Sequence, residues 1–372
     1  MNKLAETTEV LGGELPVEPA SLLGQPAGAG VPLPVDAPAT GRGALHLMAK
    51  ALFSQGCRSV FLPAFICESV VAPFSLLGFD IQFFPVDLDL QIDLDPVITQ
   101  LGGAAMAAML FINYFGFAPR LSARKRLRAI AKRHVVIEDC THGSLLESAR
   151  PAVGSIGQLV FSSLRKYLPL SDGCIVINKG NLHLPKPGPV AEAPAALRSV
   201  AALLKGSFLE AGREDHDLEE SYVKLFASAE GMIEKETESS ACSAFSRQFA
   251  RRLNLREVIA RRRANFRFLR EAFAGNQRLR KLAAPLLQKL PEGVSPFSFP
   301  ILVKEGRRDY VQAALRELRL FCAVHWRLPS EVHAGQFAET HELSSRILSL
   351  PLDQRYGSAQ MGEIVRRLAK LA

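Results

Sequence analysis

A lysine and an acid, each following a predicted strand, are the residues of this sequence best suited to chemistry. Asp139 ends the apolar run VVIED, and Lys166 follows the run QLVFSS, shortly before a turn marked by proline and glycine. Open α/β sheets bind ligands outside the carboxyl ends of their strands. Asp139 and Lys166 are therefore expected to face one site.

These residue types predict a pyridoxal phosphate (PLP) site. Lys166 can form a Schiff base with the cofactor aldehyde and, once released, can move a proton between substrate and cofactor carbons. A carboxylate at Asp139 would keep the pyridine nitrogen protonated, so that the ring accepts electrons. His142, in the same segment EDCTHG, can hydrogen-bond the phenolic oxygen or cover a face of the ring.

Two further segments supply candidates for the cofactor phosphate. Ser162 and Ser163 precede the lysine, and the sequence leaves open which of them contacts the phosphate. The segment TGRGAL, with Gly41, Arg42 and Gly43, precedes a helical pattern. Free amides at a helix N-terminus favour anions. Arg42 is expected either to bind phosphate or to be solvated.

The order of these segments resembles that of the fold type I PLP enzymes of the DegT/DnrJ/StrS group, which are sugar aminotransferases. The resemblance runs from residue 40 to residue 178 and resumes in ELSSRILSLPLDQRYG near the C-terminus. The segments that carry it are TGRGAL, VFLPAFICESVVAPFSLLGFDIQFFPVDLD, INYFG, EDCTHG and FSSLRK with SDGC. The family's loop into the partner subunit has no clear counterpart between residues 181 and 265, where residues 239–255 stand in its place.

The resemblance implies an α/β fold with a large, doubly wound, mostly parallel sheet domain and a smaller C-terminal α+β domain. It implies a homodimer that moves an amino group from an amino acid, with glutamate as donor, to a keto sugar, free or nucleotide-linked, or to a related carbonyl compound. The family's ring-stacking residue falls near residues 65–67, where Phe65 is the better candidate, although core packing suits it as well. Decarboxylation, dehydration and a non-catalytic regulatory role remain open.

The chain divides by pattern into three parts. Residues 1–39 read as an arm or linker, residues 40–275 as the PLP-binding domain with a following helical region, and residues 276–372 as the small domain. One long helix is expected over residues 247–273, and a strand over FCAVHW, residues 321–326. His325 and Trp326 then lie at the substrate entrance, and Arg327 is a candidate partner for a substrate acid.

Composition excludes several other classes. The net charge of +8 has its densest basic run in residues 120–133, an amphipathic pattern without a nucleic-acid recognition motif. The sequence has no G-x-G-x-x-G motif after its first strand, which a nicotinamide site would require. It also has no run of about 18 apolar residues, which a membrane span would require. The six cysteines lack metal-ligand spacing, and the N-terminus lacks an apolar signal core. We therefore expect a cytoplasmic enzyme with small-molecule substrates and no metal, nucleic acid or membrane partner.

Overall fold

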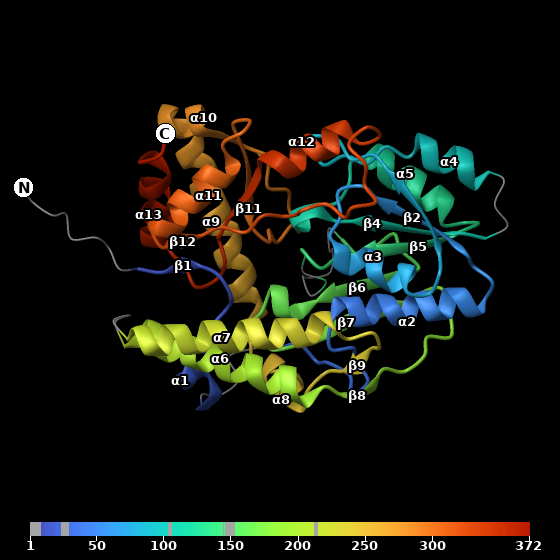
Figure 1. Ribbon diagram of the computed structural model, residues 1–372, viewed down its shortest axis with the longest axis horizontal. Coiled ribbons are helices and arrows are strands. Elements are labelled where there is room, and N and C mark those ends of the chain that lie inside the picture. Colours follow the sequence, from blue (N-terminus) through green and yellow to red (C-terminus); the bar gives the residue numbers. More distant parts are fainter. Residues whose placement is uncertain (1–8, 24–29, 103–105, 144, 146–152, 212–214) are drawn as a thin grey trace, which may run out of the picture.

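The architecture is a central sheet covered by helices, with a helical hairpin along one side and the C-terminal elements at one end (Figure 1). The computed structural model describes residues 9–23, 30–102, 106–143, 145, 153–211 and 215–372. The predicted fold class, mixed α/β with a largely parallel sheet and a separate C-terminal sheet, is confirmed.

The central sheet has six strands in the order β3-β2-β4-β5-β6-β7. All neighbours pair in parallel except β7, which runs antiparallel to β6. Sheets covered on both faces are built from nearly continuous apolar strands, such as the fully buried segment AMLFI of β4. The strands are β2 (Ser59–Pro63), β3 (Asp80–Phe84), β4 (Ala108–Ile112), β5 (Val135–Asp139), β6 (Leu159–Ser163) and β7 (Cys174–Asn178).

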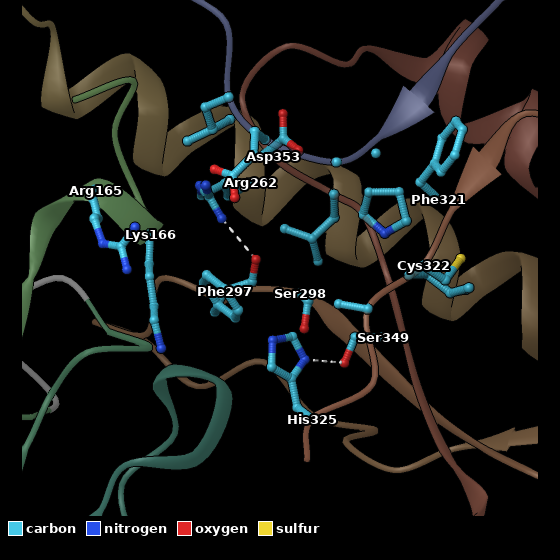
Figure 2. A pocket seen from close by; sticks show the side chains of 18 of the residues that line it. Arg165, Lys166, Arg262, Phe297, Ser298, Phe321, Cys322, His325, Ser349 and Asp353 are labelled. Carbon is cyan, nitrogen blue, oxygen red and sulfur yellow. Dashed lines mark hydrogen bonds between the residues drawn. The ribbon is translucent and has the colours of Figure 1, made fainter. Parts of the chain in front are cut away.

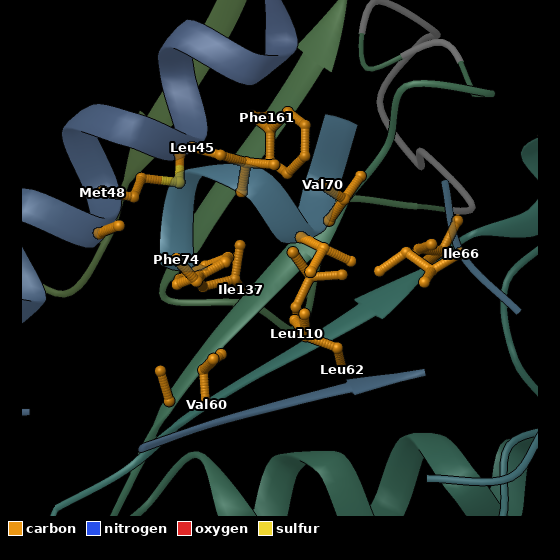
Figure 3. Close-up of a cluster of buried hydrophobic side chains, with 14 of the residues drawn as sticks. Leu45, Met48, Val60, Leu62, Ile66, Val70, Phe74, Leu110, Ile137 and Phe161 are labelled. Atoms are coloured by element: carbon orange, nitrogen blue, oxygen red, sulfur yellow. The ribbon is translucent and has the colours of Figure 1, made fainter. Parts of the chain in front are cut away.

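Helices pack on both faces of this sheet. On one face, Leu45 and Met48 of α2 and Phe74 of α3 join the core formed with Leu110 and Ile137 (Figure 3). On the other face, α4 and α5 bury a second apolar cluster. The elements between the strands are α2 (Gly41–Ser54), α3 (Glu68–Ser75), α4 (Asp95–Leu101), α5 (Leu121–Ile130) and two 3₁₀ turns, η1 (Tyr114–Gly116) and η2 (Leu164–Lys166).

The predicted basic helix corresponds to α5, which buries Leu127 and Ile130. Its arginines lie on the outer side, partly or largely exposed. This arrangement agrees with a solvated basic face.

A helical region follows the sheet. The helices α6 (Glu192–Glu210) and α7 (His216–Glu234) form an antiparallel hairpin, flanked by the paired short strands β8 (Gly188–Val190) and β9 (Ser240–Ala241). The prediction of one helix over residues 247–273 is wrong, because α8 (Ala244–Ala250) and α9 (Leu255–Gly275) are separate. Asn254 caps α9, since its side chain accepts a hydrogen bond from the Glu257 N–H.

The C-terminal part holds a three-stranded antiparallel sheet in the order β10-β11-β13. The strand expected over residues 321–326 is reduced to β12 and an isolated bridge between Ala323 and Ser349. The elements are α10 (Gln277–Leu282), β10 (Ala283–Pro285), β11 (Phe299–Val303), α11 (Arg308–Glu317), β12 (Leu320–Phe321), α12 (Ala338–Arg346), β13 (Ile347–Leu350) and α13 (Ser358–Ala369). The domain bounds given by the sequence stay predictions.

The described part of the predicted arm packs against the rest of the chain. Its strand β1 (Leu11–Gly12) pairs in parallel with β12, and α1 (Pro19–Leu23) follows. Lys205 on α6 donates hydrogen bonds to the carbonyl oxygens of Gly12 (3.3 Å) and Glu14 (2.7 Å). Burial lowers the pKa of Lys205 to about 7. The arm thereby contacts both the helical hairpin and β12 of the C-terminal part.

The described residues lack two features, a membrane-spanning helix and a metal-binding cluster. None of their helices is both long enough and apolar enough to cross a bilayer. Nor do they contain a group of three or more His, Cys, Asp and Glu side chains that could bind a metal ion.

Candidate active site

A cavity of about 330 Å³ lies where the carboxyl ends of β5 and β6 meet the N-terminus of α2. It brings together most of the residues predicted from the sequence, and its lining includes Gly41, Arg42, Asp139, His142, Ser163 and Lys166. Ser162 and Gly43 do not line it. We call this space the first cavity.

Lys166 reaches the first cavity because β6 ends in a tight turn. The 3₁₀ turn η2 starts directly after β6, and the Leu164 N–H donates to the carbonyl oxygen of Gly173 (2.9 Å). Gly173 has a φ of 111°, and a Cβ there would approach Cys242 Sγ to 3.3 Å. This glycine therefore allows the close turn that holds the lysine in place.

Asp139 ends β5 and is buried. Its Oδ1 accepts a hydrogen bond from the Thr141 N–H (2.7 Å). Burial raises the pKa of Asp139, while the hydrogen bonds from Thr141 and the charge of Lys166 oppose that rise. A carboxylate in this state would be stabilised further by a cation in the cavity.

The neighbouring acid, Glu138, serves a different purpose. Strand alternation points it to the other face of the sheet, where it accepts hydrogen bonds from the backbone N–H groups of Gly154 (2.6 Å), Ile156 (2.8 Å) and Gly157 (2.9 Å). Glu138 thus anchors a loop, and Asp139 is the acid of the pair that lines the cavity.

His142 is buried among aromatic rings. It stacks on Phe297 at 4.3 Å and on Trp326 at 5.2 Å between ring centroids. Its Nδ1 accepts a long hydrogen bond from the Phe115 N–H (3.4 Å), which leaves Nε2 as the protonated nitrogen. Burial, assisted by the charges of Lys166 and His325, places the pKa of His142 well below its usual value. Because aromatic rings already stack on His142, these contacts favour its role as a hydrogen-bond donor to the phenolic oxygen over a role in covering the cofactor ring.

The two candidate serines have different surroundings. Ser162 donates to the carbonyl oxygens of Cys140 (3.1 Å) and Gly143 (3.4 Å), so it holds the loop after β5. Ser163 lies beside Gly41, where a Cβ on the glycine would be 3.5 Å from the serine Cβ. Ser163 and the N-terminus of α2 therefore form one concave, anion-favouring surface.

The residues around Gly41 have structural partners as well. Arg42 donates to the carbonyl oxygens of Ile233 (3.3 Å) and Glu234 (2.9 Å) at the end of α7, a capping contact that sequence reasoning did not weigh. The Gly43 N–H donates to Thr40 Oγ1 (3.0 Å) within the first turn of α2. The Gly43 N–H is thus already bonded within the helix, and Gly43 does not line the cavity.

Several lining residues were missed or placed differently by the sequence. Phe65 is fully buried against Tyr114 and Trp326, whereas Cys67, two residues later, lines the cavity. Residues 64–67 lie between β2 and α3, so neither strand nor helix periodicity signals that Cys67 is the one that lines the cavity.

Glu230 of α7 also lines the first cavity, and no sequence motif signals this helix. Trp326 and His325 do reach the cavity, but Arg327 is exposed and lines neither this cavity nor the one described next.

A second cavity of about 470 Å³ lies against Lys166 and extends toward the arm and the C-terminal sheet. Figure 2 shows Lys166 and Arg165 on one side and His325, Ser298 and Ser349 on another. The residues shared with the first cavity are Arg165, Lys166, Glu230 and His325. Lys166 is therefore accessible from two compartments.

Two arginines of the second cavity, Arg165 and Arg198, are paired with carboxylates. Arg165 makes a bidentate contact with Glu230 (2.8 and 2.9 Å), and Arg198 contacts Glu230 (3.0 Å) and Glu14 (2.8 Å). Burial alone would raise the pKa of Glu230, but the two arginines lower it to about 2. The pKa of His325 falls to about 3 through burial and the charge of Lys166.

Comparison of the sequence with protein families gives one match. Residues 236–369 match the DegT/DnrJ/EryC1/StrS aminotransferase family. This range contains the C-terminal segment in which the resemblance resumes, together with residues 239–255, which stand in place of the family's loop. No curated protein sequence matches the chain significantly.

Solved structures match nearly the whole chain. The aminotransferase PseC of Helicobacter pylori, involved in pseudoaminic acid biosynthesis, gives a TM-score of 0.64 at 15% identity and covers 97% of this chain and 99% of its own. Spr1654 of Streptococcus pneumoniae in its PLP form gives a TM-score of 0.64 at 11% identity, and the match covers 98% of each chain. The aminotransferase TlmJ of Streptoalloteichus hindustanus gives a TM-score of 0.61 at 16% identity, and the match covers 90% of this chain and 84% of TlmJ.

The structural similarity, at these identities, shows the fold, and the sequence match shows similarity to the family over residues 236–369. Together they support a PLP-dependent aminotransferase. They confirm the predicted relationship of this chain to the DegT/DnrJ/EryC1/StrS aminotransferases.

Proposed function

We propose that this protein transfers an amino group from an amino acid donor, glutamate, to a keto sugar or related carbonyl acceptor, with Lys166 as the residue that carries PLP. The observation behind this proposal is that Lys166, Asp139, Ser163 and the N-terminus of α2 line a single cavity. An amine, a buried acid and an anion site are the groups that PLP chemistry requires of a protein.

The residues of the first cavity suit the cofactor. Bound PLP would supply an electron sink for the substrate carbanion. Asp139 is a buried carboxylate whose raised pKa would fall beside a protonated ring nitrogen, so the cation and the acid would stabilise each other. Ser163 and the α2 amides would hold the phosphate, and His142 Nε2 would donate a hydrogen bond to the phenolic oxygen.

The side chains near Lys166 divide the work of proton transfer. His142 and His325 are uncharged at neutral pH, because burial lowers the pKa of each. Lys166 Nζ is therefore the group that would move a proton at the substrate carbon. The rings of Phe297 and Trp326, stacked on His142, would exclude water from that step.

We also propose a homodimer in the cytoplasm, with a nucleotide-linked keto sugar as the acceptor. Decarboxylation, dehydration and a non-catalytic regulatory role use the same cofactor contacts, and turnover separates them from transamination.

The test is an absorption spectrum of the purified protein with PLP, before and after borohydride. We expect a cofactor band that borohydride fixes covalently to wild type and not to Lys166→Ala. Lys224→Ala, on the exposed face of α7, is the matched control. Glutamate should then convert the band and release 2-oxoglutarate. A band that is fixed equally in Lys166→Ala would contradict the assignment of the lysine.

A retained band without any response to amino donors would instead favour the non-catalytic role. Release of carbon dioxide or ammonia, without an amino product, would favour the other carbanion reactions.

A further inference from the structure

Arg262 of α9 is a buried cation that hydrogen-bonds oxygens from three separate segments. The residue is 1% exposed. Its Nε donates to Gln354 Oε1 (3.0 Å), its Nη1 to the carbonyl oxygen of Phe297 (2.8 Å) and its Nη2 to the carbonyl oxygen of Tyr167 (3.1 Å). Burying a charge costs free energy, so packing alone would favour an uncharged side chain here. The three partners therefore point to a further role.

Three contacts hold Tyr167, the residue that directly follows Lys166. Its carbonyl oxygen accepts the hydrogen bond from Arg262, and its ring centre lies 4.1 Å from the guanidinium carbon. The Tyr167 hydroxyl also hydrogen-bonds the Ser295 hydroxyl. These contacts fix the backbone at the end of η2, so the direction of Lys166 depends on α9 and on the segment before β11.

The same guanidinium positions the aromatic wall beside His142. Figure 2 shows the hydrogen bond from Arg262 to the Phe297 carbonyl oxygen. The Phe297 ring stacks on His142 at 4.3 Å, and the Phe297 N–H donates to the carbonyl oxygen of Phe115 (3.0 Å). The Phe115 N–H in turn donates to His142 Nδ1. Arg262 thus connects the turn that carries the lysine to the contacts that orient the imidazole.

The geometry of an arginine suits this connection. The bond from Nε to Gln354 fixes the plane of the guanidinium, and the two outer nitrogens then reach two carbonyl oxygens on different segments. A lysine has a single nitrogen on a flexible stem, so it cannot reproduce this planar fork.

We propose that Arg262 is a positioning residue for transamination. By holding two segments at once, it sets the amine of Lys166 relative to the imidazole of His142. This inference rests on the proposed function, in which Lys166 moves the proton and His142 donates to the phenolic oxygen. A displaced Lys166 would transfer the proton more slowly. A displaced His142 would donate a weaker hydrogen bond, which raises the pKa of the phenolic oxygen.

Arg262→Lys tests the proposal, because it keeps the charge and removes the fork. We expect kcat to fall at least about tenfold, while KM for the amino donor changes less than about threefold. The pH at which the absorption of bound cofactor changes should rise by about half a unit or more. Arg263→Lys is the matched control, since Arg263 donates to the carbonyl oxygens of Pro291 and Val294, which line neither cavity. All three quantities should stay near their wild-type values there.

The single tryptophan of the chain gives a readout without cofactor. Trp326 stacks on His142 at 5.2 Å, so its fluorescence reports whether the rings remain packed. In cofactor-free protein, acrylamide should quench Trp326 about twofold more strongly in Arg262→Lys than in the control. Phe297→Leu, which removes the ring and keeps the carbonyl oxygen, should have a similar effect. The two changes combined should give less than the sum of their effects, because Arg262 acts through Phe297.

Gln354→Ala keeps Arg262 and frees its Nε, at a residue that is only partly buried. It should shift kcat, the spectral pH and quenching in the same direction, by about threefold in kcat. Wild-type values in Gln354→Ala would overturn the proposal, even if Arg262→Lys does not fold. Lower stability of Arg262→Lys without a change in quenching or spectral pH would also overturn it. A wild type that binds no PLP would refute the proposed function, whereas unaltered quenching refutes the positioning by Arg262 with or without PLP.

Discussion

The two cavities that meet at Lys166 are built in different ways. The first cavity is formed mainly by strand ends and one helix N-terminus within residues 40–166, and short motifs point to most of its chemical groups. The second cavity combines the arm, the helical hairpin and the C-terminal sheet, and no local motif predicts it. Topology thus creates the first, whereas long-range packing creates the second.

Their charges differ as well. The first cavity has a buried acid, Asp139, facing an anion-favouring helix end, so it is suited to a ligand with a cation at one end and an anion at the other. The second has arginines already neutralised by Glu230 and Glu14. An anion that pairs with Arg165 or Arg198 there would compete with these carboxylates. The following changes test this contrast, from the largest expected effect to the smallest.

Asp139→Asn would remove the charge of the first cavity while keeping an oxygen for the Thr141 N–H. We expect transamination to fall by about 10²-fold or more, because a preorganised charge opposite the reacting system is lost. Glu138→Gln is the matched control, since its side chain lies on the other face of the sheet: stability should fall, but the spectrum of bound cofactor should persist. Steady-state kinetics and absorption spectra distinguish the two. Near-normal turnover in Asp139→Asn would refute the role of this acid.

Ser163→Ala would remove one predicted phosphate contact. We expect the Kd for PLP to rise about tenfold, because a hydrogen bond to a charged group is lost. Ser162→Ala should change that Kd by less than about twofold but lower the free energy of unfolding by about 1 kcal/mol, since it bonds the loop after β5. Fluorescence titration and urea denaturation measure the two quantities. A reversed result would assign the phosphate to Ser162.

Glu230→Gln would probe the charges of the second cavity. The folded-state pKa of Glu230 is about 2, below its usual 4.5, so its contribution to stability is present above pH 4.5 and is lost as the pH falls toward 2. We expect the variant to lose about 1 kcal/mol at pH 7, a figure reduced for partial exposure. Between pH 5 and pH 3, wild type should lose more stability than the variant. Parallel pH profiles in urea denaturation would contradict this.

Cys67 offers a smaller test of the first cavity. It is partly exposed, whereas the other five cysteines are buried. Alkylation by iodoacetamide should therefore occur at Cys67 and slow by at least about threefold when PLP is present, because access governs thiol reactions. Mass spectrometry identifies the labelled residue. Equal labelling with and without PLP would place Cys67 away from the cofactor.

The sequence by itself determined the part of the site that depends on strand ends. The apolar run before Asp139, the serines before Lys166 and the glycines before α2 predict one sheet edge, because parallel strands bring their carboxyl ends together. The relationship to a family and the α/β fold followed from the same segments. Each of these signals lies within a few residues of the group it positions.

Tertiary structure decided the rest. Whether Ser162 or Ser163 faces the cavity depends on which face of β6 is covered, and the direction of Arg42 depends on where α7 ends. The break at Asn254 results from a capping contact that competes with helix propensity. The network of Glu14, Arg198 and Glu230 joins side chains of the arm and the helical hairpin, and sequence periodicity carries no information about contacts over such separations, because these arise only when the elements pack.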